Sequence, residues 1–330
     1  MAMSFGSYSS RVVATRVVAL DGTGDFTDIQ SAINDLPSGG GVIYIKEGTY
    51  TVTSTINVTS NIALIGAGGC TTIQGSGVSN VISCSGVYNI LISQLRIYGG
   101  SNGLFLNSCT SITIEDCIFQ GSSNGIYVSG GLYASKISNC QFYGPVIGTD
   151  QLTWTQINNC VFWQCNGTAI SIANAWGVNI YSNGFYECKY SICIYGGNPY
   201  FGCCANTISN NSIQDGKVRG IEIHSISNTT ITGNVVDGIV YDAILLYYCS
   251  NCVVSGNYIN SQLSDGIVLW DNCDNNVITS NRCTGCSQYG IDIRTASCEN
   301  NLVVANHLTG NNLGSLNDAG TGTLKANNYT

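Results

Sequence analysis

Ionisable and aromatic residues recur at equivalent places in a series of short strand-like segments between residues 190 and 294. Two of these segments are residues 220–224 (GIEIH) and residues 290–294 (GIDIR). Side chains alternate across a β-strand, so we expect the isoleucines to point inward and the ionisable residues outward. Applied to each segment, this alternation gives two neighbouring outward columns: Tyr195, His224, Tyr247, Trp270 and Arg294; Glu222, Leu245, Val268 and Asp292. Just before the strands, a third column is formed by Arg219, Asp242 and Asp265.

The residue types in these columns could act on a sugar polymer. Asp242 and Asp265 are candidates for the acid and the base or nucleophile of glycoside hydrolysis. His224 is an alternative base and Arg294 a charge clamp, as β-elimination next to a uronate carboxylate requires. The remaining candidates would contact substrate, with aromatic rings offering flat faces to sugar rings: Tyr195, Glu222, Tyr247, Trp270 and Asp292.

Each of these residues also has a structural interpretation. Asp265 lies in Ser-Asp-Gly, a common turn into a strand, and Asp242 is similar. Tyr247 and Trp270 could pack against a neighbouring subunit. Glu222 with Arg294, or Asp292 with His224, could be surface ion pairs.

The strand-like segments belong to a longer repeat, which must position these residues. Ten times, Ile or Val is followed three residues later by Asn or Cys (once by Leu95), and two residues after that by an apolar residue. The ten first positions are Ile92, Ile114, Ile137, Ile157, Ile180, Ile208, Ile231, Val254, Ile278 and Val303. A fixed period of about 23 residues is typical of stacked coils, and the Ile, Val, Thr, Tyr and Phe content favours strands. The sequence therefore predicts an all-β fold, a right-handed parallel β-helix formed by a single chain.

Stacked coils place equivalent side chains about 4.8 Å apart along the axis. The column from Asn183 to Asn306 is expected to form a ladder of amide hydrogen bonds inside the coil. A second column should stack aromatic rings in the core: Phe119, Phe142, Phe162 and Phe185.

The opening of the chain resembles a known superfamily. Residues 21–33 (DGTGDFTDIQSAI), 37–45 (PSGGGVIYI) and 47–50 (EGTY), together with the Asn column, resemble the pectate-lyase-like right-handed parallel β-helix superfamily, which includes phage tailspike proteins. The resemblance covers roughly residues 18 to 310 and implies the fold. It implies no single chemistry, because the superfamily contains lyases, hydrolases, epimerases, esterases and non-enzymatic spikes. The polygalacturonase motifs (Asn-Thr-Asp, Asp-Asp, Gly-His-Gly) and a clear pectate lyase arrangement are not found in this sequence.

A short helix precedes the repeat. Apolar residues at Ile29, Ala32 and Ile33 predict an amphipathic helix over residues 27–36, with Thr27 and Gln30 fitting a capping box. Such a helix is expected to cover the open end of the coil stack. We expect an N-terminal extension over 1–17, the β-helix domain over 18–310, and a C-terminal cap or tail over 311–330.

Composition limits the partners. The net charge is −8, only 9% of residues are charged, and no basic cluster occurs, which argues against nucleic acid. The sequence contains no run of 18 apolar residues, so it predicts no membrane span. The first residues show no signal-peptide pattern. Many of the 17 cysteines recur in repeat columns. This favours buried thiols, although stacked neighbours could also form disulfides.

The sequence therefore predicts an extracellular or virion-associated β-helix that binds a polysaccharide and, if the outward columns form an active site, cleaves it as a lyase or glycoside hydrolase. The alternative is a non-enzymatic structural protein that uses the β-helix as a rigid assembly module. The expected partner is a polysaccharide, and a homotrimer or larger homo-assembly is a candidate state. The sequence assigns no cofactor, and calcium is a candidate ion at the carboxylates.

Overall fold

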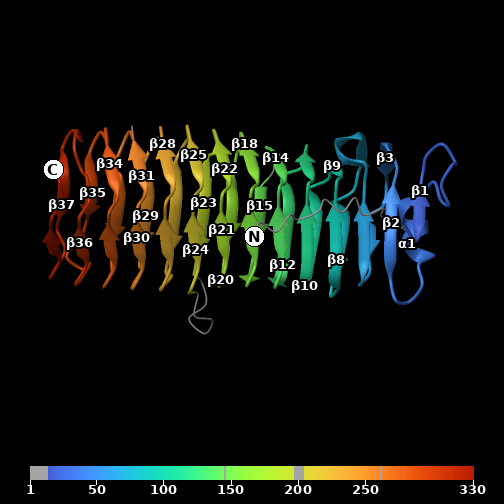
Figure 1. The fold of residues 1–330 in the computed structure, drawn as a ribbon, viewed down its shortest axis with the longest axis horizontal. Helices are drawn as coiled ribbons and strands as arrows, with labels where there is room; N and C mark the ends of the chain where they lie inside the picture. Colours follow the sequence, from blue (N-terminus) through green and yellow to red (C-terminus); the bar gives the residue numbers. More distant parts are fainter. Residues whose placement is uncertain (1–13, 145, 197–203, 261) are drawn as a thin grey trace, which may run out of the picture.

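The strands of this chain stack in parallel along one long axis, from β1 at one end to β38 at the other (Figure 1). The computed structural model describes residues 14–144, 146–196, 204–260 and 262–330, so most of the expected N-terminal extension lies outside the described residues. Each coil adds about 23 residues, and the predicted all-β parallel solenoid is confirmed.

Each full coil contributes strands to two sheets. The 11-stranded sheet contains β3 (Gly48–Val52), β6 (Thr71–Gly75), β9 (Arg96–Tyr98), β11 (Ile118–Gln120), β14 (Gln141–Tyr143), β18 (Val161–Trp163), β22 (Gly184–Tyr186), β25 (Ser212–Gln214), β28 (Val235–Asp237), β31 (Tyr258–Asn260) and β34 (Arg282–Thr284).

The 27-stranded sheet contains the remaining strands. In its first half these are β1 (Arg16–Val18), β2 (Gly41–Ile45), β4 (Ile56–Val58), β5 (Ile62–Ile65), β7 (Asn80–Ser85), β8 (Tyr88–Ser93), β10 (Asn102–Glu115), β12 (Asn124–Tyr133), β13 (Lys136–Ser138), β15 (Val146–Thr149), β16 (Leu152–Thr153), β17 (Gln156–Asn158), β19 (Thr168–Ile172) and β20 (Ala175–Trp176). In its second half they are β21 (Asn179–Tyr181), β23 (Tyr190–Tyr195), β24 (Thr207–Ser209), β26 (Arg219–His224), β27 (Thr230–Thr232), β29 (Ile244–Tyr247), β30 (Val253–Ser255), β32 (Ile267–Trp270), β33 (Val277–Thr279), β35 (Tyr289–Ile293), β36 (Leu302–Val304), β37 (Gly314–Asp318) and β38 (Leu324–Ala326).

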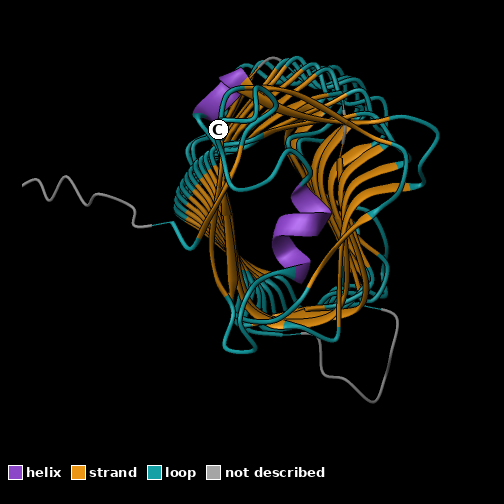
Figure 2. Cartoon of the chain, turned by 90° about the vertical axis from the view of Figure 1, so that its right-hand side faces the viewer, coloured by secondary structure: helices purple, strands orange, loops and turns teal. Residues whose placement is uncertain are grey.

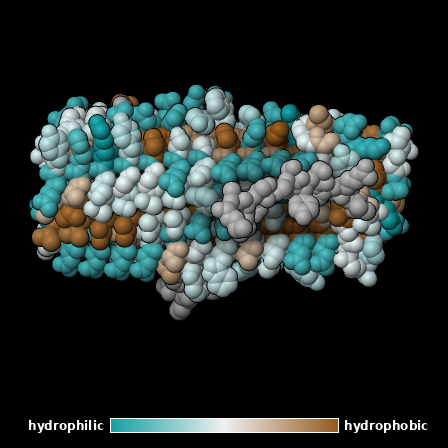
Figure 3. Space-filling model, in the orientation of Figure 1, coloured by the Kyte–Doolittle hydropathy of each residue, from teal (hydrophilic) through white to brown (hydrophobic). Residues whose placement is uncertain are grey.

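Equivalent residues of successive coils lie over one another, because each strand pairs in register with its copy in the next coil. Ile221 pairs with Ile244, which pairs with Ile267. Residues of similar hydropathy consequently form rows along the long axis (Figure 3). The expected aromatic column is confirmed: Phe119, Phe142, Phe162 and Phe185 are buried and stack with ring centroids 4.9, 4.6 and 4.9 Å apart.

The Asn column lies inside the coil and forms a continuous chain of side-chain hydrogen bonds. Each Nδ2 donates to the Oδ1 of the next residue at 2.9–3.1 Å, through Asn183, Asn211, Asn234, Asn257, Asn281, Asn306 and Asn328. Each Nδ2 also donates to a backbone carbonyl, such as that of Ile208 for Asn234. The side chains thereby satisfy buried backbone groups at the turn, which would otherwise be costly.

The helix α1 (Ile29–Asn34) lies across one open end of the coil (Figure 2). It buries the apolar face that the sequence predicted. Its N-cap is Asp28, whose side chain accepts a hydrogen bond from the Ser31 backbone N–H. The expected Thr27–Gln30 capping box is therefore wrong. Gln30 instead bonds to the Asn57 backbone on β4 and so ties the helix to the second coil.

The coil continues beyond residue 310, where the sequence analysis ended the β-helix. β37 pairs with β35 and β38 pairs with β36, both in parallel. The segment expected as a C-terminal cap or tail thus adds one more coil to the stack. None of the helices in the described part of the chain has the length and hydropathy needed to span a membrane.

Candidate functional site

The nine candidate residues come together on the outer face of β23, β26, β29, β32 and β35. Strand pairing aligns Tyr195 with His224, Tyr247 and Trp270. The same pairing aligns Glu222 with Asp292 through two apolar residues. This register follows directly from the alternation that the sequence predicted.

The Arg294 guanidinium lies among three carboxylates from three coils. Its Nε contacts Asp292 Oδ2 at 2.8 Å. Its Nη2 contacts Asp265 Oδ2 at 2.8 Å and Asp242 Oδ1 at 3.1 Å. One planar fork therefore connects β35 to the turns that precede β29 and β32, a geometry for which Arg is better suited than Lys.

A second charged group lies beside it on β26. His224 Nε2 contacts Glu222 Oε1 at 2.5 Å, and Arg219 Nη1 contacts Glu222 Oε2 at 3.3 Å. Arg219 Nε lies 3.5 Å from Asp242 Oδ2, so Asp242 joins the two groups. The ion pairs of this site join residues two or three apart along the chain, or residues on nearby coils. The Glu222–Arg294 and Asp292–His224 pairs considered from the sequence do not form.

Three further groups hold the carboxylates, and the sequence assigned none of them a role. Ser264 Oγ donates to Asp242 Oδ1 at 3.0 Å, and the Tyr289 backbone N–H donates to Asp265 Oδ1 at 2.6 Å. Asn317 Nδ2 donates to Asp292 Oδ1 at 2.8 Å. Asn317 was missed because it lies on β37, in the segment expected to be a cap or tail. Arg219 had been placed in a column but given no function.

The acids lie beneath the basic groups. Asp242 and Asp265 are 2% and 0% exposed, and Glu222 and Asp292 are also buried. The side chains of Arg219, His224 and Arg294 are 21–26% exposed. A ligand approaching this face therefore meets two guanidinium groups and an imidazole, while the carboxylates hold them from below.

Burial and pairing shift two carboxyl pKa values in opposite directions. Burial acts to raise the pKa of Glu222, but the hydrogen bond from His224 and the charge of Arg219 outweigh it, so this pKa is lowered. For Asp265 burial is the largest effect and the pKa is raised, although the Tyr289 N–H and Arg294 act against it. Glu222 is thus held as the anion beside His224.

Aromatic rings frame the basic groups. The His224 ring lies between those of Tyr195 and Tyr247, with centroids 5.0 and 5.1 Å away. Trp270 continues the row 5.8 Å from Tyr247, and the Arg294 guanidinium lies over its ring at 5.2 Å. The row fixes the orientation of both His224 and Arg294.

The carboxylates are paired with a guanidinium rather than arranged around an ion. Arg294 lies between Asp242, Asp265 and Asp292, in the place that a cation such as calcium would take. Within the described ranges, no group of three or more His, Cys, Asp or Glu side chains is placed to hold a metal.

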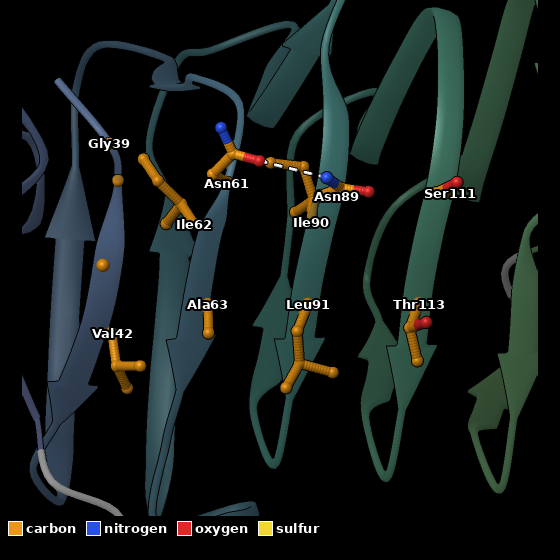
Figure 4. Close-up of a pocket in the computed structure, with 12 residues that line it drawn as sticks. Gly39, Val42, Asn61, Ile62, Ala63, Asn89, Ile90, Leu91, Ser111 and Thr113 are labelled. Atoms are coloured by element: carbon orange, nitrogen blue, oxygen red, sulfur yellow. Dashed lines mark hydrogen bonds between the residues drawn. The ribbon is translucent and has the colours of Figure 1, made fainter.

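A shallow hollow elsewhere on the surface lacks ionisable side chains. It lies on the outer face of β2, β5, β8 and β10 (Figure 4). Its walls include Val42, Ala63 and Leu91, and its polar edge contains the hydrogen bond from Asn89 to Asn61. With glycines, apolar groups, amides and hydroxyls alone, it offers no acid or base for chemistry.

Comparisons with known sequences cover most of the chain in parts. A family model described as "Right handed beta helix region" matches residues 80–201, and one described as "Periplasmic copper-binding protein (NosD)" matches residues 197–329. The described residues do not form a copper centre of three or more His, Cys, Asp or Glu side chains. A cell surface glycoprotein of Methanothermus fervidus is 26% identical over 279 residues. The match covers 76% of this chain and 46% of that protein, so the chain spans about half the length of this curated relative.

Solved structures share the fold at low sequence identity. The mannuronan C-5 epimerase AlgE6 A-module of Azotobacter vinelandii superposes with a TM-score of 0.71 at 17% identity, over 90% of this chain and 94% of that one. The Dettilon tailspike protein gives 0.75 at 20% identity, over 91% and 66%. The catalytic domain of a GH87 alpha-1,3-glucanase in complex with nigerose gives 0.69 at 14% identity, over 98% and 70%. Together with the stacked parallel coils, these likenesses show the fold, a right-handed parallel β-helix.

Proposed function

We propose that this chain binds an acidic polysaccharide across the outer face of β23 to β35 and abstracts a proton next to a uronate carboxylate, with His224 as the base. The observation that carries the proposal is the layering of the site: basic groups at the surface, held by buried acids. The guanidinium groups of Arg219 and Arg294 come from coils three apart, both contact Asp242, and together they match carboxylates along a polymer. The aromatic row beside them offers faces for sugar rings.

Glu222 would orient the base. Because its carboxylate contacts His224 Nε2, the lone pair of the neutral ring lies on Nδ1. In β-elimination, His224 takes the proton from the carbon beside the uronate carboxylate. A carbon–carbon double bond forms as the bond to the glycosidic oxygen breaks, and that oxygen takes a proton from the phenol of Tyr247. Arg219 and Arg294 offset the negative charge that develops on the carboxylate.

Hydrolysis is less well supported by this geometry. A glycosidase needs two carboxyl groups that reach opposite sides of the scissile bond. Asp242 and Asp265 are buried and share Arg294. We therefore give them a positioning role toward Arg294, in place of the acid and base roles expected from the sequence.

The similar proteins agree with a role in polysaccharide processing. Two of the solved structures are a mannuronan C-5 epimerase and an alpha-1,3-glucanase by name, and a third is a tailspike. The sequence relative is a cell surface glycoprotein, and one matching family is periplasmic. These names support a location outside the cytoplasm, where such polymers occur. The candidate homotrimer is a separate question, which light scattering of the purified chain tests.

A panel of uronate-containing polysaccharides tests the proposal. We expect ultraviolet absorbance from an unsaturated uronate product, lost in His224→Gln and kept in His307→Gln. His307 is the other histidine and bonds to Thr309, away from the site. Binding without product would make the catalytic part wrong and leave the binding part standing. Neither binding nor product on any acidic polymer would overturn the proposal and favour the structural alternative.

A further inference from the structure

We propose that the outer face of the 11-stranded sheet carries a second carbohydrate-binding surface, for a neutral polysaccharide chain. Five successive strands present one outward column here, which we call the aromatic stripe: Tyr98, Gln120, Tyr143, Trp163 and Tyr186. Four of its five members are aromatic. The stripe belongs to a different sheet from the site described above, and its strands β9 to β22 come before β23 to β35 in the chain.

The stripe leaves large apolar surface in solvent. Tyr143 and Trp163 are 46% and 42% exposed, and Tyr98 is similar. Exposed aromatic side chains on successive strands mark an interaction surface. The inward Phe column of the same strands already fills the core, so the stripe adds no core volume.

Glycines let two of these rings lie flat against the backbone. A Cβ added to Gly184 would lie 3.0 Å from Cε2 of Tyr186, so the ring lies back over its own strand. A Cβ added to Gly121 would lie 2.8 Å from Cε2 of Tyr98, which is on the preceding coil. A ring that covers a glycine turns its opposite face outward. This outward face is flat and apolar, so the C–H side of a sugar ring can pack against it.

Tyr143 is fixed in a related way. Its hydroxyl donates to Gln141 Oε1 at 2.8 Å, two residues back on the same outer face. The Trp163 and Tyr186 rings lie 5.4 Å apart with 35° between their planes, so the two rings are tilted rather than closely stacked. The stripe is therefore a set of oriented rings.

A hollow beside the stripe supplies neutral hydrogen-bonding groups. Its volume is about 730 Å³, which is within the range of ligand sites. Tyr143 and four glycines line it, and its polar lining is Ser122, Ser123, Asn124 and Asn166. Hydroxyl and amide groups can bond to sugar hydroxyls. None of these lining residues carries a charge, which favours a neutral sugar over the acidic polymer proposed for the first site.

The spacing suits a polymer that runs along the axis. Strands of one sheet lie about 4.8 Å apart, so the five strands of the stripe span roughly 19 Å. Each coil can then meet about one sugar unit. A chain of four or more sugars is consequently the ligand expected, rather than a single sugar.

Glycan-array binding followed by calorimetry with the best neutral oligosaccharide tests the proposal. We expect Trp163→Ala to weaken that binding by about tenfold or more, because a central aromatic contact is lost. Trp154→Ala is the matched control, since Trp154 is also exposed but lies outside the stripe and the hollow. His224→Gln should bind the neutral glycan as the wild type does, whatever its effect on acidic polymers.

Three results would overturn the proposal. The first is that no neutral glycan of the array binds to the wild-type chain. The second is that His224→Gln, and not Trp163→Ala, loses the binding, which would assign the glycan to the first site. The third is that Trp163→Ala splits an oligomer in light scattering and leaves glycan binding unchanged, which would make the stripe a subunit interface.

Discussion

Arg294 shows how one residue can organise the candidate site. Its fork contacts carboxylates of three coils, and its guanidinium also lies over Trp270. The carboxylates are buried, so each depends on this partner for compensation of its charge. Arg294 is thus both a surface group for a ligand and the structural centre of the acids beneath it.

Glu222 allows a test of this charge network by pH. Its folded pKa lies below the ordinary value of 4.5, because the pairing with His224 and Arg219 outweighs burial. A lowered folded pKa stabilises the fold above the unfolded value, and the contribution is lost as the pH falls through the folded value. We expect the difference in thermal midpoint between the wild type and Glu222→Gln to be largest near neutral pH and to shrink below about pH 4.5.

Glu187→Gln is the control for this series. Glu187 is exposed and bonds to Gln164 on the surface, so its replacement should leave the midpoint nearly unchanged throughout. A wild-type advantage over Glu222→Gln that grows as the pH falls would contradict the stated direction of the pKa shift.

At the scale of the element, the turn that follows each inward strand depends on one side chain. This side chain belongs to the column that contains Cys160 and Asn183. Where the column holds Asn, the amide donates to a carbonyl of the preceding coil and accepts from a backbone N–H, as Asn183 does with the Ile157 carbonyl and the Cys160 N–H. Where it holds Cys, the thiol keeps only the donor role. Cys160 Sγ donates weakly toward the carbonyls of Asn158 and Ile137. The column therefore changes chemistry along its length without changing its position.

Asn234→Leu should destabilise the fold by about 1–3 kcal/mol, because it leaves buried partners unsatisfied. Asn211 would lose the acceptor of its backbone N–H and its Nδ2, and the Ile208 carbonyl would lose a donor. Asn234→Cys should cost less, since a thiol can still donate to the carbonyls. Urea unfolding measures both variants. Equal stability of Asn234→Leu and the wild type, or a greater loss in Asn234→Cys, would contradict this account of the ladder.

These elements also show what could be predicted from the sequence. The repeat fixes the register, so the Phe column and the outward row of Tyr195, His224, Tyr247 and Trp270 followed from alternation alone. The depth of Asp242 and Asp265 did not, because alternation gives a side of the sheet and not what covers it. The N-cap was predicted one residue too early, at Thr27, because Thr27 and Asp28 are both good N-cap residues. The last coil was missed because Lys325 and Thr330 stand where the earlier repeats have apolar residues, although Asn328 keeps its place in the ladder.

At the scale of the whole molecule, stability comes from neighbouring coils rather than from distant contacts. Each coil touches mainly the one before and the one after, as in other solenoids. With 9% charged residues, the stack depends on apolar columns, amide ladders and small buried side chains. Cysteine serves as one of these small side chains: fourteen of the described cysteines are buried, while Cys70 is exposed and Cys204 is intermediate.

This distribution predicts the pattern of thiol reactivity. The thiolate is the reactive form, and burial raises the pKa of thiols such as Cys84 and Cys283. In the native protein we expect iodoacetamide to label Cys70 first and Cys204 next among the described cysteines, with the buried ones unreacted. After unfolding without reductant, peptide mapping by mass spectrometry should find a majority of the 17 cysteines labelled. If most of them stayed blocked until reductant was added, stacked cysteines would be joined as disulfides, and the coils would be cross-linked rather than held by packing alone.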